Sequence, residues 1–194
     1  MALEKERKFL IDVPFTWMGK FKALTADKVK IYQTYLKEPG VENSRVRSIL
    51  HYGKDYPGMS YVYTSKKFIS DGVNEEDEYP LTQEQFSSKL ARHVDTQKNR
   101  IIKTRYYIDF HKHKRPLAKP FELDVFEDSL LGLAILEIEL EDMAEKVITP
   151  PYLKVIKEVT NDRDYSNMNL ARIDSYKDSL LFGTIKPKFP RRCD

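Results

Sequence analysis

The chain has a single cysteine among its 194 residues, Cys193, so it can form no internal disulfide bond. This fits a reducing compartment, and we expect a cytoplasmic protein. No apolar run approaches the roughly 18 residues that a membrane-spanning helix needs. The N-terminus is charged rather than typical of a signal peptide. The sequence therefore predicts a soluble protein with no membrane partner.

The sequence also lacks a strong net charge and a glycine-rich phosphate loop. Lys and Arg number 33 against 30 Asp and Glu, which gives a net charge of +3. This small net charge gives no overall positive field that would attract nucleic acid. Nucleic-acid binding through the basic tail (186–192) or the basic loop at 111–115 is therefore the weaker alternative. Because no Walker-type loop is present, any nucleotide chemistry must come from side chains.

What the sequence does have is charge arranged at a spacing of two. In the segment LEKERKF, Glu4, Glu6 and Lys8 stand two apart, so on an extended strand all three point to one side. That side cannot pack against an apolar core, because burying one unpaired charge costs several kcal/mol. It must face water, a metal or a charged ligand.

The same spacing returns in LEIELE, where Glu137 and Glu139 alternate with leucine and isoleucine. This strand is expected to be covered outside and charged inside. One such pair usually marks a solvated strand face, but repeated pairs of opposite sign predict a closed sheet with a polar interior. The further pairs are Arg45 with Arg47, Lys103 with Arg105, Glu76 with Glu78, and Glu122 with Asp124.

The predicted fold is therefore a β-dominated α+β domain, an eight-stranded antiparallel closed β-barrel with helices packed outside. A capping-box pattern, Thr82 with Gln85, begins one covering helix. Residues 15–24 form either a short amphipathic helix or a capping loop, and helical segments are expected from 142 onward, with a terminal helix at 169–181. The strands are expected at 3–12, 28–36, 43–51, 59–69, 74–79, 98–110, 119–127 and 133–141.

In an interior lined by both acidic and basic side chains, the two kinds of charge can bind different ligands. Arg and Lys can cradle several phosphates. Carboxylates repel phosphate and need a divalent cation between, and oxygen-only ligands favour Mg²⁺ or Mn²⁺. This supports a site that binds or cleaves a triphosphate. Alternation alone leaves open whether Lys66 or Lys67 is the inward cation of its strand. The histidines at 111 and 113 could bind a metal or a polyanion, although a solvated loop is the simpler interpretation.

The motifs resemble the CYTH superfamily, the triphosphate tunnel metalloenzymes, most closely the short bacterial inorganic triphosphatases. The resemblance covers 1–170, and 171–194 is expected to be a helix and basic tail of the same domain. It implies an eight-stranded tunnel that binds a linear triphosphate with divalent metal. The motifs, in family order, are the ExExK signature at 4–8, SRVR at 44–47, YTSK at 63–66, EDEYPL at 76–81, KTRY at 103–106, FELDVF at 121–126, LEIEL at 136–140 and EVTNDRDYSN at 158–167.

The resemblance also implies roles for single residues. The implied metal carboxylates are Glu4, Glu6, Asp124, Glu137 and Glu139, with Glu4 or Glu6 also orienting the attacking water. The implied phosphate-binding cations are Lys8, Arg45, Arg47, Lys66, Lys103 and Arg105, and the implied tunnel-lining carboxylates are Glu76, Glu78 and Glu122. Asp164 departs from the family pattern, which usually has a basic residue there, so Arg163 is the candidate for the C-terminal cation.

The resemblance leaves several activities open, because the family includes inorganic, thiamine, nucleoside and RNA triphosphatases and a class of adenylate cyclases. We expect hydrolysis of inorganic tripolyphosphate, with ATP or thiamine triphosphate as alternative substrates. The motifs are also compatible with a class IV-type adenylate cyclase and with a non-catalytic protein that binds a triphosphate or nucleotide. The sequence does not distinguish a monomer from a homodimer.

Overall fold

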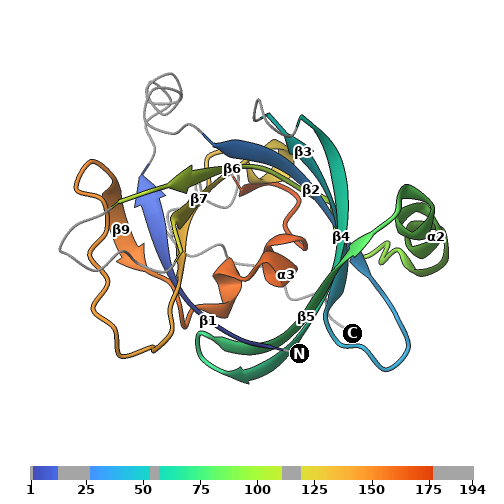
Figure 1. Cartoon of the computed structure of the whole chain (residues 1–194), viewed down its shortest axis with the longest axis horizontal. Helices are drawn as coiled ribbons and strands as arrows, with labels where there is room; N and C mark the ends of the chain where they lie inside the picture. Colours follow the sequence, from blue (N-terminus) through green and yellow to red (C-terminus); the bar gives the residue numbers. More distant parts are fainter. Residues whose placement is uncertain (1, 13–26, 53–56, 111–118, 177–194) are drawn as a thin grey trace.

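The structure is a computed structural model that describes residues 2–12, 27–52, 57–110 and 119–176. Figure 1 shows its strands arranged as a ring, with helix α2 (Gln83–His93) outside it. The short elements η2 (Asp128–Leu130), η3 (Arg163–Tyr165) and α3 (Asn167–Leu170) complete the described helices. The strands are β1 (Ala2–Asp12), β2 (Lys28–Leu36), β3 (Ser44–His51), β4 (Gly58–Ser70), β5 (Val73–Leu81), β6 (Ile101–Ile108), β7 (Phe121–Phe126), β8 (Ala134–Glu139) and β9 (Lys154–Glu158).

The ring closes through antiparallel pairs. Its order is β5-β4-β3-β2-β6-β7-β8-β1, and β5 pairs with β1 to complete it. The predicted eight-stranded closed antiparallel barrel is therefore confirmed. β5 pairs with the first half of β1, from Ala2 to Lys5, whereas β9 pairs with its second half, from Phe9 to Asp12. The ninth strand, β9, thus pairs with the part of β1 that lies beyond its pairing with β5.

A glycine turn brings the β4–β5 hairpin against β1. Gly72 has φ +74°, in the left-handed region that favours glycine. The backbone N–H of Glu6 donates to the carbonyl oxygen of Gly72 at 2.9 Å. A Cβ at Gly72 would lie 2.9 Å from the carbonyl oxygen of Glu6. Only glycine allows this close approach, which closes the barrel beside the ExExK segment.

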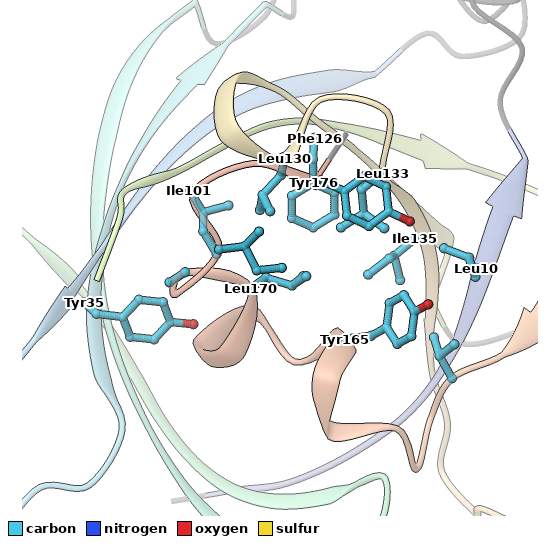
Figure 2. Packing of buried hydrophobic residues seen from close by; sticks show 13 residues of the cluster. Leu10, Tyr35, Ile101, Phe126, Leu130, Leu133, Ile135, Tyr165, Leu170 and Tyr176 are labelled. Atoms are coloured by element: carbon cyan, nitrogen blue, oxygen red, sulfur yellow. The ribbon is translucent and has the colours of Figure 1, made fainter. Parts of the chain in front are cut away.

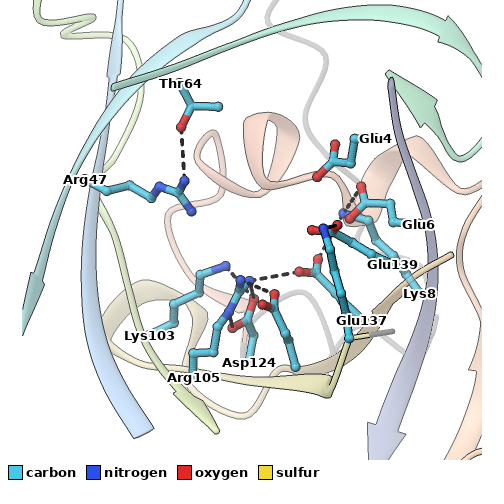
Figure 3. Close-up of polar contacts among 12 residues, drawn as sticks. Glu4, Glu6, Lys8, Arg47, Thr64, Lys103, Arg105, Asp124, Glu137 and Glu139 are labelled. Atoms are coloured by element: carbon cyan, nitrogen blue, oxygen red, sulfur yellow. Dashed lines mark hydrogen bonds and ion pairs between the residues drawn. The ribbon is translucent and has the colours of Figure 1, made fainter. Parts of the chain in front are cut away.

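Strand β8 alternates as predicted, with charge inside and apolar side chains outside. On β8, Leu136 and Ile138 are fully buried on the outer face beneath residues such as Leu140 and Leu153. Their neighbour Glu137 points into the barrel (Figure 3). The expectation that this strand is covered outside and charged inside is confirmed.

Helix α2 covers another part of the outer surface. The Thr82 hydroxyl accepts a hydrogen bond from the backbone N–H of Gln85, and the backbone N–H of Thr82 donates to Gln85 Oε1, so the predicted capping box is present. Phe86 and Leu90 pack against a small cluster that includes Val46. The predicted covering helix is confirmed.

The segment after β9 lies inside the ring rather than outside it. Tyr165 and Leu170, from η3 and α3, pack against inward-facing Leu10, Tyr35 and Ile101 (Figure 2). These contacts fill one side of the barrel interior with an apolar cluster. We call residues 159–176 the inner segment.

The prediction of helices from 142 onward was wrong in two places. Residues 154–158 form β9, in which Val155 and Lys157 alternate in burial with exposed neighbours, a two-residue period that the prolines before it obscured. α3 ends at Leu170, and residues 171–175 form no helix.

The predictions for 15–24 and 111–115, and for the tail after 176, lie outside the described residues. Within the described ranges, no helix is long and apolar enough to cross a membrane.

Candidate active site

The barrel encloses a cavity of about 650 Å³, which we call the central cavity. Side chains from every strand of the ring and from the inner segment reach it, and Figure 3 shows acidic and basic groups facing each other across it. The predicted site residues that line it are Glu4, Glu6, Lys8, Arg45, Arg47, Lys66, Glu76, Glu78, Lys103, Arg105, Glu122, Glu137, Glu139 and Arg163. Asp124 is fully buried behind this lining.

Strands β1 and β8 place their charges side by side. Register pairs Lys8 with Glu137, and Glu6 with Glu139. The ammonium nitrogen of Lys8 lies 3.0 Å from Glu6 Oε1 and 3.0 Å from Glu137 Oε1. Burial alone would raise the pKa of Glu137, but Lys8 and Arg105 outweigh burial and hold the pKa well below its usual range. Glu137 is therefore a stable carboxylate at neutral pH.

Strands β6 and β7 build a second group of charges around Asp124. Arg105 binds it through two parallel hydrogen bonds, Nε to Oδ1 and Nη2 to Oδ2, each 2.7 Å long. The same guanidinium reaches Glu137 at 2.9 Å and also pairs with Glu122. This fork-on-carboxylate geometry fixes the plane of Arg105.

Lys103 lies beside this group and is only 1% exposed. Its ammonium donates to Asp124 Oδ2. Burial lowers the pKa of Lys103 to about 8, Asp124 opposes this fall, and the neighbouring charge of Arg105 adds to it. Lys103 thus loses its charge more readily than an ordinary lysine.

The two arginines of β3 are buried and incompletely paired. Arg47 donates to Thr64 at 3.1 Å and pairs with Glu78, yet its Nε has no hydrogen-bond partner. Arg45 is 8% exposed, its Nε also has no partner, and it forms no ion pair with any carboxylate in the described ranges. Burial alone would lower the pKa of Arg45, but nearby Tyr35, Glu76 and Glu4 raise it. The unbonded Nε of each arginine is a donor that a bound anion can accept from. Arg45 and Arg47 therefore mark the anion-binding wall of the cavity.

The structure of strand β4 shows which of its two lysines, Lys66 or Lys67, points into the barrel. Lys66 faces the cavity between Glu4 and Glu76, with its ammonium 2.7 Å from Glu76 Oε2 and also paired with Glu4. The side chain of Lys67 is 73% exposed and lies 4.0 Å from Glu75. The inward cation is Lys66, as the resemblance implied.

Two residues beside the cavity, Lys119 and Phe68, were not predicted as site residues. Lys119 pairs with Glu139, but it precedes β7 and is out of step with the inward positions Glu122 and Asp124, so two-residue alternation could not find it. The guanidinium of Arg163 stacks 4.6 Å above the ring of Phe68. Phe68 follows Lys66 by two residues, so its inward direction could have been read from the strand pattern.

The carboxylates fit a hard divalent ion by their chemistry. Glu4, Glu6, Glu137 and Glu139 offer only oxygen ligands from one wall of the cavity, as Mg²⁺ and Mn²⁺ prefer. Within the part of the chain that the structure describes, no three acidic, His or Cys side chains already stand together as a metal site. Each of the four carboxylates instead has a lysine partner.

Comparison with known proteins gives this geometry a context. No family model matches the chain. The inorganic triphosphatase of Nitrosomonas europaea is 41% identical over 78 residues, which are 39% of this chain and 47% of that protein. This match confirms the predicted resemblance to an inorganic triphosphatase. The chain matches about half the length of this relative.

Solved structures extend the comparison along the chain. The crystal structure of the inorganic triphosphatase NE1496 is 30% identical and covers 90% of this chain and 98% of its own, with a TM-score of 0.49. The PH1819 protein from Pyrococcus horikoshii OT3 is 18% identical and covers 73% of this chain and 80% of its own, with a TM-score of 0.50. At this identity, the likeness to PH1819 concerns the fold alone.

Proposed function

We propose that this chain hydrolyses a linear triphosphate inside the barrel, with inorganic tripolyphosphate as the preferred substrate and orthophosphate as a product. The observation that carries the proposal is Arg45, a buried guanidinium whose Nε has no hydrogen-bond partner, in a cavity that also holds Arg47 and Lys66. A chain of phosphates supplies the anionic oxygens that these groups need. The inorganic triphosphatase to which the chain is similar supports the same substrate class.

Six cations from four strands would hold the phosphates in the cavity. Lys8 reaches in from β1, the arginines from β3, Lys66 from β4, and Lys103 with Arg105 from β6. Asp124 orients Lys103 and Arg105 from behind, with both of its oxygens engaged by them. We therefore assign Asp124 a positioning role in place of the metal-ligand role implied by the resemblance.

The acidic wall distinguishes a hydrolase from a simple binder. A protein that only sequesters triphosphate needs the cations, whereas the inward carboxylates Glu4, Glu6, Glu137 and Glu139 add a wall that repels phosphate. These carboxylates would hold Mg²⁺ or Mn²⁺, and Glu4 or Glu6 would orient the attacking water. A divalent ion in such a site bridges phosphate oxygens and lowers the pKa of bound water.

The test is a product analysis. The purified protein is incubated with Mg²⁺ or Mn²⁺ and, in separate reactions, tripolyphosphate, ATP and thiamine triphosphate, and all products are quantified. We expect orthophosphate, fastest from tripolyphosphate, and no turnover with EDTA. Cyclic AMP with pyrophosphate from ATP would show a cyclase instead. Tight binding of tripolyphosphate with no product under any metal condition would show a binder.

A further inference from the structure

The lysines of the central cavity already occupy the carboxylates proposed for metal. Lys66 pairs with Glu4 and Glu76, and Lys8 pairs with Glu6 and Glu137. A carboxylate that holds an ammonium attracts a second cation less strongly, so a lysine and a metal ion compete for the same oxygens.

Both lysines line the cavity that contains the anion-binding wall, and Lys66 lies next to that wall. Arg45 pairs in register with Thr64, and Lys66 is the next inward residue along β4. A phosphate seated on the guanidinium of Arg45 would present oxygens to Lys66. An ammonium drawn to these oxygens would leave Glu4, because one lysine cannot bind a phosphate and a carboxylate on opposite sides of the cavity equally well.

We propose that Lys66 and Lys8 exchange partners, from carboxylates to phosphate, so that the phosphate chain and the divalent ion bind cooperatively. This inference rests on the proposed function and adds a coupling between its two ligands. Phosphate binding frees Glu4, Glu6 and Glu137 for metal, and metal binding frees the two lysines for phosphate. Such coupling is reciprocal by thermodynamic necessity.

The exchange has a consequence for catalysis. Metal binds weakly to the empty barrel and tightly once an anion is seated, so the carboxylates that organise the water acquire their ion only with substrate in place. Lys66 is the more direct test of the two, because its strand also supplies a matched control. Lys67 is the next residue, points outward and is largely exposed.

The experiment measures Mn²⁺ binding rather than activity. Free Mn²⁺ is quantified by electron paramagnetic resonance during titration of the protein in chloride and in sulfate at equal ionic strength. Sulfate serves as the phosphate-like probe, and a titration without protein corrects for its own binding of Mn²⁺. We expect sulfate to tighten Mn²⁺ binding by about fivefold or more.

Variants identify the residue responsible. Lys66→Met is expected to bind Mn²⁺ more tightly than the wild type in chloride and to respond less to sulfate, whereas Lys67→Met is expected to match the wild type in both. Thermal melting confirms that each variant is folded. Wild-type binding that is equal in chloride and sulfate would overturn the exchange, as would a Lys66→Met variant identical to the wild type. Those outcomes leave triphosphate hydrolysis intact, while absence of Mn²⁺ binding in both salts would remove the metal from the proposed function as well.

Discussion

Lys8 of β1 faces Glu137 of β8 across the strand register, with its ammonium nitrogen 3.0 Å from Glu137 Oε1. The same ammonium also holds Glu6, so one lysine pairs with two buried carboxylates, of which Glu137 has a second partner in Arg105. Removing one member of a buried ion pair leaves an uncompensated charge, which is the costly event in such networks.

Lys8→Met should therefore destabilise the fold by about 3 kcal/mol at pH 7. The pKa of Glu137 is lowered in the fold, so its contribution to stability is present above the ordinary carboxyl pKa and is lost as pH falls through the folded value. The difference between wild type and variant should shrink on acidification. Urea unfolding at pH 7 and at about pH 3 measures it. Lys5→Met, an outward change on the same strand, is the control, and an equal loss there would contradict the argument.

Glu4→Gln and Glu6→Gln should each reduce kcat by about a hundredfold or more while the barrel stays folded. The amide keeps the shape of the side chain but no longer offers a negative oxygen to a metal ion or to the water. Rates with tripolyphosphate and circular dichroism measure the two parts of this prediction. Glu75→Gln, on the outward face of β5, should keep the wild-type rate. Wild-type turnover in both glutamate variants would refute the assignment of the acidic wall.

Arg47→Ala should act mainly on substrate affinity. The guanidinium is buried, pairs with Glu78 and has an Nε with no partner, so it is placed to hold phosphate rather than to activate water. We expect KM for tripolyphosphate to rise by about tenfold or more, with a smaller change in kcat, as for the loss of one charge-assisted hydrogen bond. Steady-state kinetics separate the two constants. A large fall in kcat at unchanged KM would place Arg47 in the chemical step instead.

The lowered pKa of Lys103, about 8, predicts an alkaline limit for substrate binding. Above this pH the lysine loses its positive charge, so KM for tripolyphosphate should rise between about pH 8 and pH 9.5. The pKa lies below the ordinary value of 10.5, so the unfolded chain holds this proton more tightly and Lys103 favours folding more as pH rises through that interval.

Lys103→Arg supplies the matched variant for this prediction, because arginine stays charged throughout the range. Its KM profile should be flat where that of the wild type rises. A wild-type profile that is flat to pH 9.5 would mean that bound phosphate or Asp124 keeps Lys103 protonated.

The barrel and its charged lining were predictable because each strand repeats the same two-residue pattern. Residues two apart on a strand point to the same side whatever the conformation of the turns, as Glu4 and Glu6 do. Closure of the sheet into a barrel follows from having charge on the inner face and apolar residues on the outer face. Burial depth was not available from this pattern. Asp124 looks like any inward carboxylate in the sequence, but two neighbouring cations on β6 draw it behind the cavity lining.

The inner segment could not be placed for a different reason. Its apolar residues Tyr165, Leu170 and Ile173 fit any buried surface, and no periodicity says whether that surface lies inside or outside a barrel. The deciding partners, Leu10 and Tyr35, are apolar residues at inward positions of otherwise polar strand faces. Such exceptions to alternation were the available signal, because an apolar side chain facing a polar interior requires a cover.

Leu170→Ala tests this placement directly. Leu170 is fully buried in the cluster that joins α3 to β1, β2 and β6, so its truncation should leave a cavity and lower the free energy of unfolding by about 3 kcal/mol. Leu131→Ala, at an exposed position next to η2, should cost no more than about 0.5 kcal/mol. Urea unfolding of both variants gives the comparison. Equal, small losses would show that the inner segment contributes little to the packing of the barrel, because a residue that seals an apolar interior cannot be shortened without exposing what it covers.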